Sequence, residues 1–453
     1  MRLARLPRRV PALLFLGSAT LTAVFLLVAP DSLGPAGAND YEGYYRPAAE
    51  SLLRGDGYRL NGEVNLHNPP GYPYVLVVLY ALAELSGASQ LAWVTVFSVL
   101  CTAASTVVAH AVARRLFGDR TALVAAALFA TYPLTLVMAS YRFSEVPYTL
   151  ALLLVLLATV RALQSRRRLF AWALGAGLLC AAAALVRPAA IGLALPVGLA
   201  VLLCRGGPAA LRARVVAAAL VVLGFVAGVA PWEAWVYAKT DRVIALSEVG
   251  PEAAVVGVIV GARGEALEPG DPVFVPEAVR AMSRRILADR DSLQGTGDVL
   301  RRVAEEPAGD VAQLVAGKAV RAFYGTDSFK LEPLILLVQL PYLALMGAGL
   351  LVARRSGQPL ARWSPVLFAL VLAYSWVVTL SALSIVRYMA PALALLTIPA
   401  AAAGIAGWDG LRRCRAGGRP RLGSWTGRAS KCDRRRQAAP PSCTRGRWPR
   451  GGP

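Results

Sequence analysis

Charge is scarce in this chain. Charged residues make up 17% of its 453 residues and hydrophobic residues 56%, whereas soluble domains are about 25% charged. Lysine occurs at only four positions and histidine at two. This composition excludes an ordinary soluble domain and predicts an integral membrane protein.

The six cysteines lack the spacing of a disulfide framework or of a zinc site. Cys101 and Cys180 lie inside apolar runs, Cys204 ends another run, and the other three lie near the C-terminus. The cysteines therefore exclude a small disulfide scaffold, and they do not define a metal centre.

The formal charge of +21 is mainly a property of the C-terminal tail. Residues 411–453 contain thirteen basic residues and one acid, Asp433. The tail has almost no aliphatic residues, so we expect it to be disordered. Clustered basic residues next to a spanning helix attract anionic lipid head groups, and nucleic acid is not an expected partner because no nucleic-acid-binding fold accompanies the patch.

The first apolar run, Val10–Val28, is long enough to cross a bilayer, which takes about 20 residues. Ala36-Gly37-Ala38 has the pattern of a signal-peptide cleavage site. We favour an uncleaved anchor, because the run exceeds the roughly 7–15 residues of a signal-peptide core and the site lies beyond it. The arginines before Val10 place the N-terminus in the cytoplasm.

Nine further long apolar runs follow, and a shorter one, Tyr74–Leu85, precedes them. Runs of roughly 10–14 residues are more often interfacial than spanning. If a helix near 73–86 lies flat on the membrane, every short basic loop falls inside, as orientation rules require. The long runs are 91–112, 121–139, 147–160, 169–186, 189–203, 215–235, 331–352, 363–383 and 388–406.

The predicted fold class is an all-α polytopic membrane protein. It has about ten transmembrane helices, both termini inside, and interfacial helices in the first outer loop. The predicted parts are a cytoplasmic N-terminus with the first helix (1–30), an outer catalytic loop (31–90), a transmembrane bundle (91–236), an outer loop or small helical lid (237–330), C-terminal transmembrane helices (331–407) and a basic disordered cytoplasmic tail (408–453).

This topology brings several polar side chains to the outer face. Ionisable residues at a membrane boundary are costly and indicate function. Asp40 and Glu42 lie in the first outer loop, Glu145 begins a later apolar run, and Arg187 and Arg387 lie at membrane edges. As a set on one face, they predict a working site.

Each residue of this set also has a purely structural alternative. Asn39 or Asp40 would cap a helix over roughly 41–54, on which Tyr44 and its neighbours form an amphipathic face. Arg187 and Arg387 would reach to lipid head groups. His67 would be only a loop residue. In the helical lid, Pro276–Arg290 and Gly297–Phe323 are expected to form two amphipathic helices.

The order of the motifs resembles the GT-C glycosyltransferases, in the branch that includes the protein O-mannosyltransferases and the aminoarabinose transferase of lipid A. The likeness spans roughly residues 10–407. Asp-Glu is often adjacent in that family, where this chain has Asp40-Tyr41-Glu42. The motifs are Asp-x-Glu-x-x-Tyr at 40–45, Asn-Pro-Pro-Gly-Tyr-Pro at 68–73, Ala-Arg-Arg-Leu-Phe-Gly at 113–118, Ser144-Glu145, Leu-Val-Arg-Pro at 185–188 and Arg387-Tyr388-x-x-Pro391.

The resemblance implies an enzyme that transfers a sugar from a polyprenyl-phosphate donor to a glycan, lipid or protein acceptor. Transfer would occur with inversion on the outer face of a cell membrane, most simply a bacterial plasma membrane. A carboxylate must take the proton of the acceptor hydroxyl, and cations must hold the phosphate. Asp40 is the expected base and Glu145 the residue that positions a substrate. Expected substrate contacts are Glu42, Tyr44, His67, Arg187, Arg387 and Tyr388.

No cofactor is expected. An Asp-x-Asp nucleotide-sugar motif does not stand out on the cytoplasmic side, which agrees with a lipid-linked donor. A divalent ion between Asp40 and Glu145 stays open. Two other functions also stay open: a transporter or flippase of lipid-linked saccharides, and a non-catalytic partner of a transferase. A transporter would be expected to show inverted repeats and charges near the bilayer midplane, and neither is evident.

Overall fold

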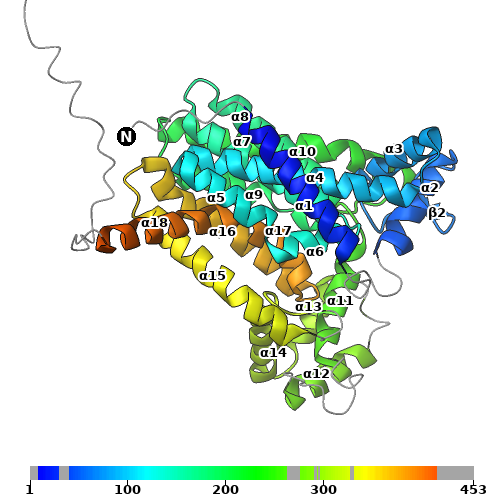
Figure 1. The fold of residues 1–453 in the computed structure, drawn as a ribbon. Coiled ribbons are helices and arrows are strands. Elements are labelled where there is room, and N and C mark those ends of the chain that lie inside the picture. The colour runs from blue at the N-terminus through cyan, green and yellow to red at the C-terminus, as the bar shows by residue number, and fades with distance from the viewer. Residues whose placement is uncertain are drawn as a thin grey trace, which may run out of the picture.

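The structure is a computed structural model, and it describes residues 9–29, 40–262, 276–289, 293, 296–326 and 331–415. These residues form a helical bundle with two extensions, one at the right and one at the bottom of the view (Figure 1). One extension carries the first loop, and the other is a group of shorter helices, α11 to α14, at the bottom of the view (Figure 1). The predicted all-α polytopic fold is confirmed.

Seven helices are long and apolar enough to cross a membrane, and two bent helix pairs raise the number to nine among the described residues. The single helices are α1 (Val10–Val28), α4 (Gln90–Phe117), α7 (Glu145–Gln164), α8 (Leu169–Val186), α10 (Leu211–Thr240), α15 (Glu332–Arg354) and α16 (Pro359–Ser381). The protein is therefore a multi-pass membrane protein.

Proline explains both bent pairs. Helices α5 (Asp119–Ala130) and α6 (Pro133–Ser140) meet at 45°, with Pro133 in the first turn of α6. Helices α17 (Val386–Leu395) and α18 (Thr397–Arg415) meet at a bend of 53° just before Pro399. A proline at the start of a helix keeps its own geometry but cannot continue the preceding helix.

The remaining predicted span, 189–203, has the predicted extent but is too short to count among the helices that could cross a membrane. It forms a 3-10 turn, η3 (Pro188–Ala190), and a helix, α9 (Ala194–Leu203), and together they are a shorter apolar segment. Helix α3 (Gly71–Ser86) is the other such segment, where the sequence predicted an interfacial helix. The ten predicted spans are thus seven helices, two bent pairs and one short segment.

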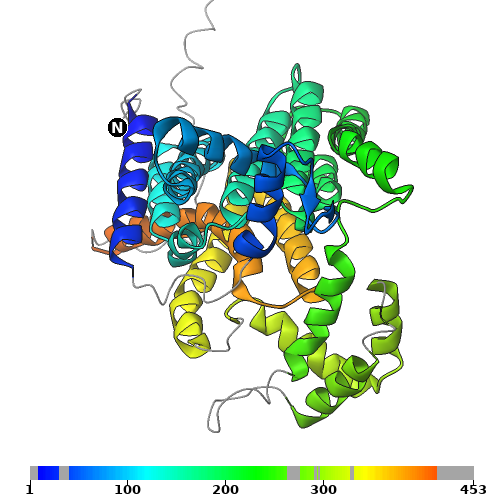
Figure 2. The ribbon, with the colours of Figure 1, turned by 90° about the vertical axis from the view of Figure 1, so that its right-hand side faces the viewer.

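Small residues let the central helices approach closely. A Cβ atom on Gly177 of α8 would lie 2.1 Å from the carbonyl oxygen of Val221 in α10. A Cβ atom on Gly224 of α10 would lie 2.6 Å from the carbonyl oxygen of Leu174 in α8. Membrane helices associate through such contacts because lipid offers no hydrophobic drive between them. Helix α1 packs on the outside against α4, where the Ser18 and Thr106 hydroxyls lie 2.8 Å apart (Figure 2).

The loop after α1 contains a π-helical turn, η2 (Tyr41–Tyr45), and a helix, α2 (Arg46–Leu53), near the predicted 41–54. A short hairpin of β1 (Arg59–Leu60) and β2 (Glu63–Val64) follows, which the sequence analysis did not predict. Asn61 and Gly62 both have positive φ, 53° and 88°, as a tight two-residue hairpin turn requires.

Helices α11 (Val249–Ala262), α12 (Glu277–Ala288), α13 (Thr296–Ala304) and α14 (Ala308–Arg321) are here called the helical unit. The prediction of two helices in this region was wrong, because the structure has four. The second is broken at Pro307, which precedes α14 and cannot continue α13, and α11 was not predicted. Both views place the unit at the same end of the bundle (Figures 1 and 2).

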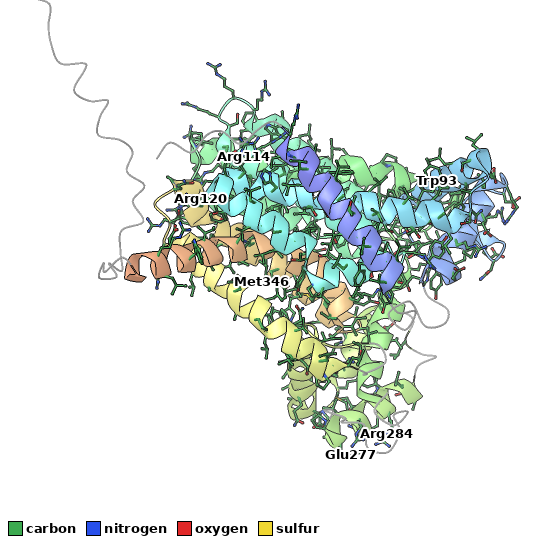
Figure 3. The ribbon with its side chains drawn as sticks, in the orientation of Figure 1. Trp93, Arg114, Arg120, Glu277, Arg284 and Met346 are labelled. Carbon is green, nitrogen blue, oxygen red and sulfur yellow. The ribbon has the colours of Figure 1, made fainter. Side chains whose placement is uncertain are left out.

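The predicted tail begins later than expected, because α18 continues to Arg415. Residues 416–453 and the Ala36-Gly37-Ala38 motif lie outside the described residues, so the predicted disorder and the uncleaved anchor stay predictions. Arg114 and Arg120 lie at the opposite end of the molecule from Glu277 and Arg284 of α12 (Figure 3). This separation agrees with the predicted topology, in which basic loops and the helical unit lie on opposite sides.

Candidate active site

Four charged residues from distant parts of the chain meet at one point. Glu145 is fully buried, and its Oε1 atom accepts from Arg187 Nη1 at 2.9 Å and also from Arg387 Nε. Arg387 donates its Nη2 group to Asp40 Oδ2. Two carboxylates and two guanidinium groups therefore form one connected ionic cluster, here called the ionic cluster.

Each member lies at the end of an element, where a polar residue can meet the others without interrupting an apolar helix. Asp40 precedes η2, Glu145 begins α7, Arg187 follows α8, and Arg387 is the second residue of α17. The element ends thus bring the charges together.

Neighbouring side chains fix the arginines. Arg187 Nη1 donates to the Ser144 hydroxyl at 3.1 Å, and that hydroxyl lies 3.1 Å from the Tyr45 hydroxyl. Burial raises the pKa of Tyr45 to about 12, so its hydroxyl stays protonated at neutral pH. The Arg387 guanidinium lies 3.6 Å above the centre of the Phe143 ring. Stacking on an aromatic face is an arrangement that favours arginine over lysine.

The turn before Glu145 is held by the first loop. Arg142 has φ of 58°, in the left-handed region, and its carbonyl oxygen accepts from the Tyr72 hydroxyl at 2.6 Å. Such a conformation costs a non-glycine residue free energy unless its surroundings enforce it. Tyr72 therefore couples the Pro-Pro-Gly segment to the start of α7.

A cavity of about 290 Å³ lies beside the ionic cluster. Asp40 and Arg187 are its charged lining residues, and Tyr44, His67, Tyr148 and Tyr388 supply aromatic surface. Most of the other lining residues have small, mainly apolar side chains and belong to η3, α11, α16 and α17. Two charged groups and a mainly apolar wall suit an amphipathic ligand.

The structure places the predicted site residues in three positions. Asp40, Tyr44, His67, Arg187 and Tyr388 line the cavity. Glu145 and Arg387 are connected to the lining residues Asp40 and Arg187 but are not part of the lining. Glu42 also lies outside the lining and pairs with Arg46 at 3.0 Å on the exposed face of the first loop.

The structural alternatives can now be compared with the geometry. The Asp40 side chain makes no capping hydrogen bond and instead pairs with Arg387. Arg187 and Arg387 both pair with Glu145 inside the protein, so they do not need lipid head groups as partners. The His67 ring stacks on Tyr44, with ring centres 3.9 Å apart and 16° between the planes, so His67 is part of the cavity wall.

Sequence reasoning missed several lining residues. Asn68 lies in the quoted Asn-Pro-Pro-Gly motif and could have been found there. Tyr45 also belongs to a quoted motif. Tyr148, one turn after Glu145, and the α11 residues Val249, Gly250 and Ala253 carried no motif. Their position depends on how the helical unit packs, which no local pattern reveals.

The donor set does not fit a metal ion between Asp40 and Glu145. Arg387 pairs with both carboxylates, so an ion there would have to displace its guanidinium. Among the residues that the structure describes, no group of three His, Cys, Asp or Glu side chains is arranged to hold a metal ion.

Comparison with known proteins defines the class of fold. The model of the family described as dolichyl-phosphate-mannose-protein mannosyltransferase matches residues 67–235. The archaeal oligosaccharyltransferase AglB from Archaeoglobus fulgidus, in complex with an inhibitory peptide and a dolichol-phosphate, has a similar structure with a TM-score of 0.55 at 14% identity. The fold is therefore the GT-C membrane fold that the sequence motifs indicated.

The similarity to AglB covers 91% of this chain but 52% of that protein, so this chain spans about half the length of that relative. A second structure of the Archaeoglobus fulgidus oligosaccharyltransferase, tethered with an acceptor peptide, matches with a TM-score of 0.53 and 15% identity, over 90% of this chain and 51% of that one. ArnT from Cupriavidus metallidurans, bound to undecaprenyl phosphate, has 17% identity and a TM-score of 0.42, over 89% and 80% of the two chains. No curated protein is significantly similar to this chain in sequence.

Proposed function

We propose that this protein is a membrane glycosyltransferase that moves a sugar from a polyprenyl-phosphate donor to an acceptor hydroxyl, with inversion at the anomeric carbon. One observation carries the proposal: Asp40 lines the cavity beside Arg187, while Arg387 holds one of its two carboxylate oxygens. A base and a phosphate-binding cation thus adjoin one space. The other oxygen of Asp40 is left for the proton of the acceptor.

In the proposed reaction, Asp40 takes the proton as the acceptor oxygen bonds to the anomeric carbon. The bond from that carbon to the phosphate oxygen breaks, and its electron pair stays on the phosphate. Because a phosphate is already a good leaving group, no general acid is needed. Attack from the face opposite the phosphate inverts the configuration.

The net charge of the ionic cluster changes during this reaction in step with the charge of the phosphate. Before transfer, Asp40 and Glu145 balance Arg187 and Arg387, and the donor phosphodiester carries one negative charge. During transfer the phosphate gains a second negative charge while Asp40 is neutralised by the proton. The cluster then carries a net positive charge when the leaving phosphate needs it, which is the kind of electrostatic stabilisation that lowers a barrier most.

Glu145 has a positioning role in this proposal. It shares one oxygen between the two arginines, which would otherwise repel each other at close range. Arg187, which lines the cavity, would bind the phosphate, and Arg387 would hold Asp40 beside it. Arginine suits this task because its planar group binds two oxygens at once.

Three further features support the proposal. The AglB structure contains a dolichol-phosphate, a ligand with the same polar and apolar parts as the proposed donor. The cavity adjoins helices that are apolar enough to span a membrane. The basic loops predict an orientation in which the site faces away from the cytoplasm, and in a bacterium the site would face outward from the plasma membrane. The acceptor would be a glycan, a lipid or a protein.

The test is sugar transfer from radiolabelled polyprenyl-phosphate sugars in membranes that contain the protein. Asp40→Asn is compared with the parent and with Glu42→Gln at matched expression. We expect Asp40→Asn to lose transfer by roughly a hundredfold or more, as removal of a general base does, and Glu42→Gln to retain it. If Asp40→Asn retains full transfer, Asp40 is not the base. Translocation without transfer would favour a flippase.

A further inference from the structure

The hydroxyl group of Tyr148 has no role in holding the described part of the protein together. Tyr148 lies one turn after Glu145 on α7, is 4% exposed and lines the cavity. Its hydroxyl forms no hydrogen bond with any residue that the structure describes, yet it is not one of the unpaired polar atoms that are completely buried. The hydroxyl therefore keeps some accessible surface, and the open space that Tyr148 lines is the cavity.

Tyr148 differs in this respect from every other buried tyrosine in the described residues. A buried tyrosine hydroxyl usually finds a partner, and the other six form hydrogen bonds within the protein. These bonds join Tyr41 to Tyr80, Tyr45 to Ser144, Tyr58 to the Asn68 carbonyl oxygen, Tyr72 to the Arg142 carbonyl oxygen and Tyr132 to Gln339. The partner that Tyr148 lacks is therefore expected to be a ligand in the cavity.

The surrounding structure holds the Tyr148 ring in place. The ring belongs to the main apolar core, and a tyrosine side chain has only two rotatable bonds to fix. Tyr374, which interacts electrostatically with Tyr148, is itself held by hydrogen bonds to the Gly192 backbone N–H and the Ala189 carbonyl oxygen. The Tyr148 hydroxyl is thus positioned before any ligand binds.

The charges around Tyr148 indicate which part of a ligand it would meet. Among the described residues, Arg187 is the one charged group that interacts electrostatically with the Tyr148 hydroxyl. Tyr45, by contrast, interacts with Arg187 and also with Asp40 and Glu145. A phenolic hydroxyl is an O–H donor at neutral pH. Next to a cation, and without a carboxylate to compete for it, this donor suits an anionic acceptor.

We propose that the Tyr148 hydroxyl donates a hydrogen bond to a phosphate oxygen of the lipid donor, next to Arg187. The inference rests on the proposed glycosyl transfer, and it adds a neutral donor to the arginine that binds the phosphate. Because the phosphate gains a second negative charge as the sugar leaves, this hydrogen bond becomes stronger in the transition state and accelerates transfer.

The first experiment compares Tyr148→Phe with the parent in the binding of two sugar-free lipids, polyprenyl phosphate and the polyprenol of the same length. We expect the variant to bind polyprenyl phosphate about 10–100-fold more weakly, because a hydrogen bond to a charged group is lost. Polyprenol should bind equally to both proteins, since the apolar wall is unchanged. Equal binding of polyprenyl phosphate by both proteins, or an equal loss with polyprenol, would overturn the inference.

Transfer provides a second readout. In Tyr148→Phe, inhibition by the released polyprenyl phosphate should weaken by the same factor as its binding, and kcat should fall as well. Tyr132→Phe is the matched control, because its hydroxyl bonds to Gln339 and Tyr132 does not line the cavity. This control should keep the kcat and the inhibition constant of the parent.

The outcomes separate this inference from the proposed function. If the parent transfers sugar and Tyr148→Phe has the same kcat, the inference fails and the proposed function stands. If the parent neither transfers sugar nor binds polyprenyl phosphate, both fail.

Stability distinguishes this role from a structural one. Tyr148→Phe removes a hydroxyl that has no partner in the described protein, so the unliganded variant should be as stable as the parent. Tyr132→Phe should lower the thermal unfolding temperature, because it removes a buried hydrogen bond. A comparable loss of stability in Tyr148→Phe would assign its hydroxyl to the fold and contradict the inference.

Discussion

The ionic cluster and the helical unit both pair arginines with carboxylates, but in opposite ways. In the helical unit, Arg285 and Arg302 converge on Glu306 at 2.5 and 2.8 Å, and Arg302 also pairs with Asp289. These partners are 4 to 21 residues apart in sequence. In the ionic cluster, Arg387 pairs with residues 242 and 347 positions away.

This difference separates pairs that stabilise local structure from pairs that build a site. In the helical unit Glu306 is buried, but Arg285 is 48% exposed, so these pairs between neighbouring helices are partly screened by water and contribute modestly to stability. Burying charges from distant segments requires that each be paired, because an unpaired buried charge is strongly destabilising. A protein keeps such an arrangement where its chemistry needs it, and here the arrangement borders the cavity.

The largest expected effect is that of Glu145→Ala. The substitution leaves Arg187 and Arg387 close together without the carboxylate that they share. Breaking a buried ion pair costs about 3–5 kcal/mol, so both the thermal unfolding temperature in detergent and the transfer rate should fall steeply. Glu145→Gln keeps the shape and should lose less stability than Glu145→Ala. Full activity in Glu145→Ala would mean that the cluster is not part of the site.

Arg387→Lys should have the next largest effect. A lysine keeps the charge but cannot bridge Asp40 and Glu145 while stacking on Phe143. We expect transfer to fall by about 10–100-fold, which corresponds to 1–3 kcal/mol. Arg46→Lys is the matched control, because Arg46 bridges Glu42 and Glu50 on the exposed face of α2. If Arg387→Lys and Arg46→Lys lose the same activity, the buried position of Arg387 does not make its ion pairs more important for transfer than those of Arg46.

Lys318 should give the helical unit a pH dependence. Its buried amine donates to the Gly257 carbonyl oxygen of α11, and burial lowers the pKa of Lys318 from 10.5 to about 8. Between these values the unfolded state binds more protons, so the stability of the unit should rise with pH, by about 1.4 kcal/mol per pH unit at most. Limited proteolysis of the parent relative to Lys318→Met, at pH 7.5 and pH 9.5, measures this. An equal ratio at both values would contradict it.

The smallest expected effect is in the ion pairs of the helical unit. Arg285→Gln combined with Glu306→Gln should leave the transfer rate unchanged and lower the thermal unfolding temperature moderately, because Glu306 is buried but its arginine partners reach water, which screens the pairs. Arg284→Gln provides a control for the loss of one surface charge. A large loss of transfer in the double variant would show that the helical unit acts on the site through this network.

Much of this molecule follows from sequence, and the exceptions have physical causes. Apolar length located the spans, and the charges expected on the outer face included Asp40, Glu145, Arg187 and Arg387, which the structure brings together. Apolar length alone predicted continuous helices over 121–139 and 388–406, where prolines produce two bent helix pairs. Glu42 was grouped with Asp40 by nearness in sequence, although the helical turn between them directs Glu42 to Arg46. The part of the cavity wall that α11 forms could not be predicted, because its position depends on tertiary packing alone.

Arg387 also determines when the site can exist during synthesis. Glu145 precedes it by 242 residues, so at about 5–20 residues per second its carboxylate waits roughly 10–50 s for this partner. A chain that stops after α16 would therefore contain both carboxylates but lack the cation that joins them. We expect such a chain to be inert, because Arg387 is the residue that joins the two carboxylates.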